Sequence, residues 1–173
     1  MRIITLLSIL LIFFDISFAI EPEETDILKK GNKIPDFSLK LTDNKEVSIS
    51  DYKGKLTLIV FFATWCKPCL EELPHIQNDI WNIYETNDNF RLLVIGRGHD
   101  NSEVKSFIEN NKYTFPAAGD KDKSIFSLFA QQYIPRSYLI DRNGKVIRNT
   151  IGYDEDSFNE LKMHISRELS KVQ

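Results

Sequence analysis

The chain has 173 residues and a formal net charge of −3, and it is 42% hydrophobic and 27% charged. This balance excludes a disordered chain, and mild acidity without a basic block argues against nucleic-acid binding. The length predicts one domain with its own core. The two cysteines, Cys66 and Cys69, are too few for a disulfide-rich scaffold or for a zinc site of four thiolates.

The N-terminus has the features of an export signal. Arg2 precedes an apolar run, and small residues at Ser17 and Ala19 match a signal-peptidase pattern. The run is shorter than the ~20 residues of a membrane span, and Asp15 near its end disfavours a permanent membrane helix. We therefore predict a signal peptide over residues 1–19, cleaved near Ala19, and a periplasmic or otherwise extracytoplasmic protein. An uncleaved N-terminal membrane anchor is the alternative.

The next segments predict a short leader, a hairpin and a buried strand. Residues 20–33 are charged and weakly patterned, so we expect them to lead onto a single domain over residues 34–173. Apolar residues alternate with polar ones on both sides of the Asp43-Asn44 turn, which predicts a β-hairpin: Phe37, Leu39, Leu41, Val47 and Ile49. The continuous apolar run LTLIVFFA, residues 56–63, predicts a strand buried on both faces.

A long helix is predicted over residues 67–84 by apolar residues at helical spacing: Leu70, Leu73, Ile76, Ile80 and Ile83. Further patterns predict a strand at 90–95, a helix at 102–110, a short helix at 124–131 and a strand at 137–140. The Asn143-Gly144 turn then returns the chain in a strand at 145–151. This order predicts an α/β sandwich with a mixed sheet.

An amphipathic helix is predicted at the C-terminus, after the last hairpin. Its apolar positions are Phe158, Leu161, Ile165 and Leu169. Asp154 and Asp156 are candidate N-caps, and Ser157-x-x-Glu160 is a candidate capping box.

The chemistry is predicted at Trp65-Cys66-Lys67-Pro68-Cys69, where the buried strand meets the long helix. At a helix start this spacing lets the two sulfurs bond. Free N–H groups, the helix dipole and the Lys67 charge favour a thiolate at Cys66, and Pro68 suits the first turn because it lacks an N–H. Cys69 falls inside that turn, so we expect Cys66 to attack a partner disulfide and Cys69 to resolve the mixed disulfide.

Two other interpretations of the cysteine pair are weaker. A structural disulfide at this spacing closes too small a loop to add much stability. A metal site needs two further ligands from His75, His99 or His164, and none of these has a companion at ligand spacing. We therefore predict no metal at the pair and no bound cofactor.

The segment FFATWCKPCLEELP resembles the active-site segment of the exported TlpA/ResA-like thiol–disulfide oxidoreductases. Ile134-Pro135, ahead of a strand, matches the family's cis-proline, and Pro74, Gly144 and Gly152 also stand at family positions. The resemblance implies a thioredoxin-like fold: a mixed central sheet flanked by helices, with an added N-terminal β-hairpin. It implies substrate-binding residues at Trp65, Lys67, Pro68, Ile134 and Pro135.

Three positions refine what the resemblance implies. In the family the cis-proline faces the cysteines, and the backbone of the residue before it, here Ile134, pairs with bound peptide. Cytoplasmic thioredoxins carry a buried Asp six residues before the first Cys, where this chain has Val60. Glu72 matches a glutamate that ResA-like proteins place near the cysteines, which implies a catalytic proton relay to Cys69. A solvated helix glutamate is the alternative.

Three further polar residues flank the expected site. Arg97 and His99 follow a strand end, where a solvated loop is the favoured interpretation over substrate contact. Arg136 directly follows Pro135, and we expect it either to bind partners or to be exposed.

By resemblance, the chain reduces disulfides in other exported proteins, for example haem-attachment cysteines during cytochrome c maturation, and a membrane electron donor re-reduces the pair. Two other functions on the same fold stay open. One is a thiol peroxidase of the peroxiredoxin type, although Thr64-Trp65-Cys66 has the wrong Thr-to-Cys spacing for it. The other is a copper- or haem-binding chaperone, which CxxC disfavours because copper chaperones of this fold use a wider pair.

Overall fold

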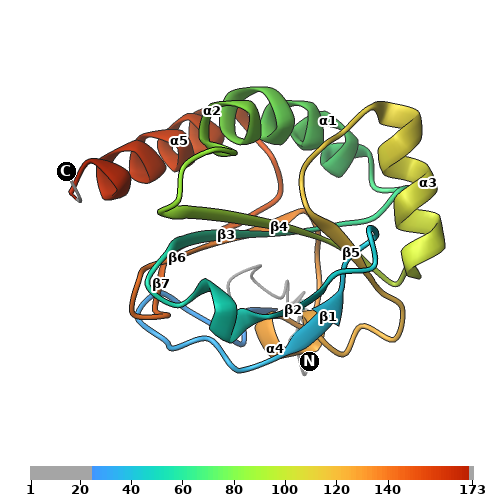
Figure 1. Ribbon diagram of the computed structural model, residues 1–173, viewed down its shortest axis with the longest axis horizontal. Helices are drawn as coiled ribbons and strands as arrows, with labels where there is room; N and C mark the ends of the chain where they lie inside the picture. The colour runs from blue at the N-terminus through green and yellow to red at the C-terminus, as the bar shows by residue number, and fades with distance from the viewer. Residues whose placement is uncertain (1–24, 172–173) are drawn as a thin grey trace, which may run out of the picture.

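A computed structural model describes residues 25–171. Its centre is a five-stranded sheet in the order β5-β4-β3-β6-β7 (Figure 1). The strands are β3 (Leu56–Phe62), β4 (Phe90–Arg97), β5 (Ala117–Asp120), β6 (Arg136–Ile140) and β7 (Val146–Ile151). Strands β3, β4 and β5 run parallel, whereas β6 is antiparallel to both β3 and β7. The predicted mixed sheet is confirmed.

Different elements cover the two faces of the sheet (Figure 1). One face carries α1 (Lys67–His75), α2 (Asn82–Tyr84), α3 (Asn101–Asn111) and α5 (Glu155–Ser170). The other carries the hairpin β1 (Ser38–Lys40) and β2 (Glu46–Ser48), the 3-10 turn Ile49–Tyr52, and α4 (Phe126–Phe129). The thioredoxin-like arrangement with an added N-terminal hairpin is therefore confirmed.

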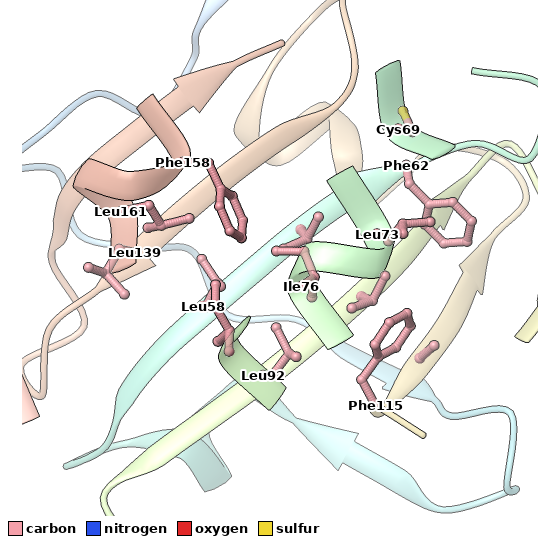
Figure 2. Close-up of a cluster of buried hydrophobic side chains, with 14 of the residues drawn as sticks. Leu58, Phe62, Cys69, Leu73, Ile76, Leu92, Phe115, Leu139, Phe158 and Leu161 are labelled. Carbon is pink, nitrogen blue, oxygen red and sulfur yellow. The ribbon is translucent and has the colours of Figure 1, made fainter. Parts of the chain in front are cut away.

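Strand β3 is buried on both faces, as its unbroken apolar run predicts. Leu58, Val60 and Phe62 pack under the helices, whereas Ile59 and Phe61 face the hairpin side. Figure 2 shows the helix-side cluster, with Cys69 at its edge. The two core layers hold β3 fixed, so the loop that follows it, which carries the first cysteine, starts from a rigid point.

The predicted long helix is divided in the structure. Lys67–His75 is α-helical, the next segment, Ile76–Trp81, is π-helical, and α2 completes the run. The π-helical segment begins two residues after Pro74, which lacks the N–H that a regular helix needs there. The wider turn shifts the helical register, so Ile83 is 60% exposed although its spacing predicts burial. Leu70, also expected in the core, is 41% exposed.

Strand β5 is absent from the sequence-based prediction. Its residues Ala-Ala-Gly-Asp neither alternate in polarity nor favour a strand by composition, so only pairing with β4 defines it. Gly119 permits the close approach of the segment that leads into α3, because a Cβ there would lie 2.5 Å from the His99 carbonyl oxygen. The Gly119 N–H donates to Asn101 Oδ1 at 2.6 Å, which joins β5 to the start of α3.

The first described residues are part of the folded domain rather than a leader. Asp26 forms a β-bridge with Ala130, and Lys33 forms one with Lys145. Leu28 belongs to the core. Within the described residues, buried side chains are therefore already present at Thr25, ahead of the predicted boundary at residue 34. The predicted signal peptide, its cleavage and the alternative anchor lie outside the described residues. Within residues 25–171 no helix is long and apolar enough to cross a membrane.

Asp154 is the N-cap of α5, and its side chain accepts a hydrogen bond from the backbone N–H of Ser157 at 2.8 Å. The candidate capping box that starts at Ser157 is wrong, since Ser157 lies inside the helix. We expect Asp154→Ala to lower the free energy of unfolding by about 1 kcal/mol. Asp156→Ala, which removes a carboxylate from the same turn without breaking the cap, is the matched control. Equal losses in urea unfolding would contradict the assignment.

Candidate active site

The two cysteines form a disulfide at the junction of β3 and α1, with their Cα atoms 5.2 Å apart. Cys66 is the N-cap of α1, and the backbone N–H of Cys69 points at its Sγ at 3.3 Å. Pro68 occupies the first turn. Cys66 is 5% exposed and Cys69 is fully buried, so Cys66 carries the accessible sulfur. The free N–H groups and the dipole of α1 stabilise negative charge on that sulfur once the pair is reduced.

The loop before β6 lies against this sulfur. The Ile134–Pro135 peptide bond is cis, as the resemblance implies. The Ile134 carbonyl oxygen is 3.6 Å from Cys66 Sγ. Because β6 pairs with β3, the end of the loop reaches the same edge of the sheet as the start of α1.

A groove of about 400 Å³ opens at the disulfide. It brings together four of the five predicted substrate-binding residues, and its full lining is Trp65, Cys66, Lys67, Pro68, Arg97, Tyr133 and Ile134. Pro135, the fifth, is buried outside this lining. Trp65 and Tyr133 are 69% and 46% exposed, which leaves two aromatic side chains open to a partner. The groove therefore offers both a reactive sulfur and an apolar contact surface.

Glu72 is buried beneath this site, which contradicts the interpretation as a solvated helix glutamate. It follows Cys69 by three residues on α1, so the two side chains share a helix face. Its Oε1 accepts a hydrogen bond from Ser137 Oγ at 3.2 Å, and its Oε2 has no hydrogen-bond partner within residues 25–171. Burial raises the pKa of Glu72 to about 7, although the hydrogen bond from Ser137 opposes the shift.

A small cavity adjoins the Glu72 carboxyl. Its volume is about 10 Å³, and residues of the β7–α5 connection, including Gly152 and Tyr153, complete its lining. That volume accommodates about one water molecule. Val60, which stands where cytoplasmic thioredoxins carry their buried Asp, is fully buried and pairs with Ser137 across the sheet. In this chain the buried carboxyl group of this region, that of Glu72, therefore comes from helix α1 rather than from strand β3.

His99 is buried, so the expected solvated loop is wrong at this position. Its Nε2 accepts a hydrogen bond from the backbone N–H of Thr64 at 3.2 Å, two residues before Cys66. Its Nδ1 lies 3.6 Å from a Glu103 carboxylate oxygen on α3. His99 thus joins α3 to the loop that carries the cysteine. The sequence gives little indication of the contact between His99 and Thr64, because the two residues are 35 positions apart.

Arg136 is 1% exposed, so the expectation of an exposed side chain is wrong. Its Nε donates to the carbonyl oxygens of Gln132 and Tyr133, at 2.7 and 3.1 Å. Its guanidinium also forms a buried ion pair with Asp26 and a hydrogen bond with Thr25. The first described residues are therefore tied to the loop that presents Ile134 to the disulfide.

Two further side chains donate hydrogen bonds to Asp26. The Tyr138 hydroxyl and Asn149 Nδ2 donate to its carboxylate at 2.8 and 2.7 Å. Burial and the Asp26 carboxylate both raise the pKa of Tyr138, so this hydroxyl remains a donor. The network is charge-balanced and largely satisfied, which is the condition for burying an ion pair.

Comparison with known proteins agrees with this geometry. Residues 29–164 match the Redoxin family. The chain belongs to that family. ResA, the thiol–disulfide oxidoreductase of Geobacillus thermodenitrificans (strain NG80-2), is 32% identical over 135 residues, which cover 78% of this chain and 75% of that protein. The chain is therefore a TlpA/ResA-like member of the thioredoxin superfamily and a thiol–disulfide oxidoreductase.

Solved structures show the same relationship. A putative protein disulfide isomerase from Bacteroides thetaiotaomicron is 35% identical, with a TM-score of 0.81, and the match covers 84% of this chain and 93% of that one. A putative thiol:disulfide interchange protein DsbE from Chlorobium tepidum is 29% identical, with a TM-score of 0.74 over 82% and 99% of the two chains. The redox pair thus lies on a scaffold shared with proteins named for disulfide exchange.

Proposed function

We propose that this oxidoreductase is exported and reduces disulfides in other exported proteins through the Trp65–Cys69 segment. The observation that carries the proposal is the asymmetry of the pair: the N-terminus of α1 points at Cys66 Sγ, while Cys69 is fully buried beneath it. An accessible sulfur stabilised as thiolate attacks, and a shielded one resolves. The names of the ResA and DsbE relatives support the same chemistry.

The reaction proceeds in two exchanges. The Cys66 thiolate attacks one sulfur of the partner disulfide, forming a mixed disulfide and releasing the other partner sulfur as a thiolate, which takes up a proton. Cys69 then loses its proton and attacks Cys66 Sγ, which releases the second partner thiolate and leaves the Cys66–Cys69 disulfide of the structure. Two electrons pass to the partner, and a membrane electron donor restores the dithiol.

Glu72 accepts the Cys69 proton in the second exchange. A group with a pKa near 7 is suited to take a proton at neutral pH and to return it during re-reduction. The position of Glu72 on the Cys69 face of α1 and its single hydrogen bond support this role, because a carboxyl without strong partners keeps its basicity.

The partner polypeptide lies in the groove as an extended segment. Ile134 offers its backbone beside Cys66, so the partner pairs with it as an added strand. The exposed side chains of Trp65 and Tyr133 in the groove lining supply apolar contact. The haem-attachment cysteines of c-type cytochromes lie in a polypeptide substrate of this kind. The family resemblance supports their assignment as a substrate.

Mixed-disulfide trapping tests the function. We expect Cys69→Ser, in the native host, to form discrete adducts with exported proteins through Cys66, which dithiothreitol releases. Cys66→Ser is the matched control and should form none, because Cys69 is buried. The proposal fails if no adduct appears and the wild-type pair neither reduces insulin nor exchanges with a glutathione buffer.

A further inference from the structure

The groove at the disulfide has a charge pattern unlike that of the whole chain. Two of its lining residues, Lys67 and Arg97, are cations and none is acidic, whereas the chain carries a net charge of −3. Across residues 25–171, no carboxylate lies within ion-pair distance of either cation. The two charges are therefore available to a bound molecule.

Two carboxylates close to Arg97 in the sheet and along the chain have other partners. Asp120 pairs with Arg97 in the sheet, but its carboxylate accepts hydrogen bonds from the backbone N–H groups of Ile125 and Phe126 at 3.2 and 2.8 Å. Asp100 caps α3 and accepts from the backbone N–H groups of its first turn. Neither acid neutralises the groove directly.

Arg97 is held in place by an aromatic ring rather than by an acid. Its Cζ lies 4.5 Å from the centroid of Phe126, and its Nε is buried without a hydrogen-bond partner within the described part of the chain. A guanidinium stacked on a ring loses little freedom when it binds a carboxylate, and it presents several donors in one plane. This side chain is preorganised for an anionic group.

We propose that the groove selects partner proteins in which Asp or Glu flanks the reacting cysteine. This substrate class rests on the proposed function, since it specifies the partners of the same exchange. The exposed rings of Trp65 and Tyr133 contact any polypeptide, whereas Lys67 and Arg97 discriminate by charge. An acidic segment is attracted and a basic one repelled.

The same cations also act on the exchange itself. A carboxylate beside a partner cysteine raises the pKa of its thiol and makes that thiolate a poorer leaving group. When the segment lies in the groove, Lys67 and Arg97 offset this charge as the partner's sulfur–sulfur bond breaks and the departing sulfur becomes a thiolate. Selectivity therefore appears in the rate constant of exchange as well as in binding.

Three cyclic peptides test the proposal. They carry one disulfide in the same sequence, with Glu, Gln or Lys beside the cysteines, and the second-order rate constant of their reduction by the reduced full chain is measured. At low salt we expect the Glu peptide to react about tenfold faster than the Lys peptide, with Gln between, because each exposed ion pair contributes a few-fold. Rising ionic strength should shrink the ratio.

The readout for variants is the Glu-to-Lys rate ratio, because a change in the Cys66 thiolate affects all three peptides equally. Lys67→Gln/Arg97→Gln should bring the ratio close to one, and Lys67→Gln alone to roughly threefold. Lys30→Gln/Lys45→Gln removes two exposed cations outside the groove and should keep the full ratio. The proposal is overturned if the Glu-to-Lys rate ratio of the wild type is one. It is also overturned if Lys67→Gln/Arg97→Gln keeps the wild-type ratio. Failure to reduce any peptide overturns the proposed function instead.

Discussion

Arg136→Met lowers the free energy of unfolding by about 3–5 kcal/mol, because it leaves the Asp26 carboxylate buried without its guanidinium partner. The Asp26 side chain is 2% exposed, so water cannot take over that role. The Tyr138 and Asn149 donors remain, but neither carries a positive charge. Urea unfolding of the oxidised protein measures the loss.

Two further variants make this prediction specific. Arg136→Met/Asp26→Asn removes both charges and should recover much of the stability, since the penalty lies in the unpaired charge. Arg167→Met removes an exposed arginine, with a side chain 61% exposed, and should cost less than about 0.5 kcal/mol. If Arg136→Met and Arg167→Met unfold at the same urea concentration, the buried ion pair is not a determinant of stability.

The same network bears on activity. Arg136 holds the carbonyl groups of Gln132 and Tyr133, which directly precede the residue that contacts the cysteine. A loosened loop should therefore slow the reduction of a protein disulfide more than that of a small aromatic disulfide, which makes no strand pairing with Ile134. Thr25 and Asp26, which bond to Arg136, thus support the loop that precedes β6.

Glu72→Gln stabilises the protein at pH 8 by up to about 3 kcal/mol, and it slows resolution of the mixed disulfide by about a hundredfold or more. In the unfolded chain Glu72 ionises near the ordinary glutamate pKa of 4.5, whereas in the folded chain burial raises that pKa to about 7. Between these values the folded state binds more protons than the unfolded state, so wild-type stability falls as pH rises. Glutamine does not ionise and avoids this loss.

Two measurements check this prediction. Urea unfolding between pH 4 and pH 8 should show wild type and Glu72→Gln nearly equal at the acid end and separated at pH 8. Single-turnover release of a trapped peptide should show the slower resolution near neutral pH. Glu71→Gln, an exposed neighbour on the same helix, is the control and should match wild type in both. If the free energy of unfolding of the wild type does not change between pH 4 and pH 8, the pKa of Glu72 is not raised in the folded protein.

Most of the reactive site follows from local sequence. The positions of Cys66, Cys69 and Pro68 depend on how a helix starts after a buried strand, and three or four residues decide that. The family resemblance adds Glu72 and the cis-proline; the Ile134–Pro135 bond is cis, and Glu72 is buried on α1. By contrast, strand β5 escapes prediction because its short, small-residue sequence has no strand pattern of its own. The π-helical segment is not predicted, because apolar residues continue through it at the spacing of an α-helix.

By itself, then, the sequence determined the redox pair and the class of fold, since these depend on periodicity and on neighbours within one helical turn. Only the tertiary structure decided which charged groups are buried and which are free. Arg136 pairs with Asp26 across 110 residues, whereas Arg97 forms no ion pair within residues 25–171. Arginine therefore forms a buried ion pair at position 136, whereas at position 97 it is a cation without an ion-pair partner in the described part of the chain. The physical reason is that burial and pairing depend on which distant segments exclude water around a charge, and no local pattern records that.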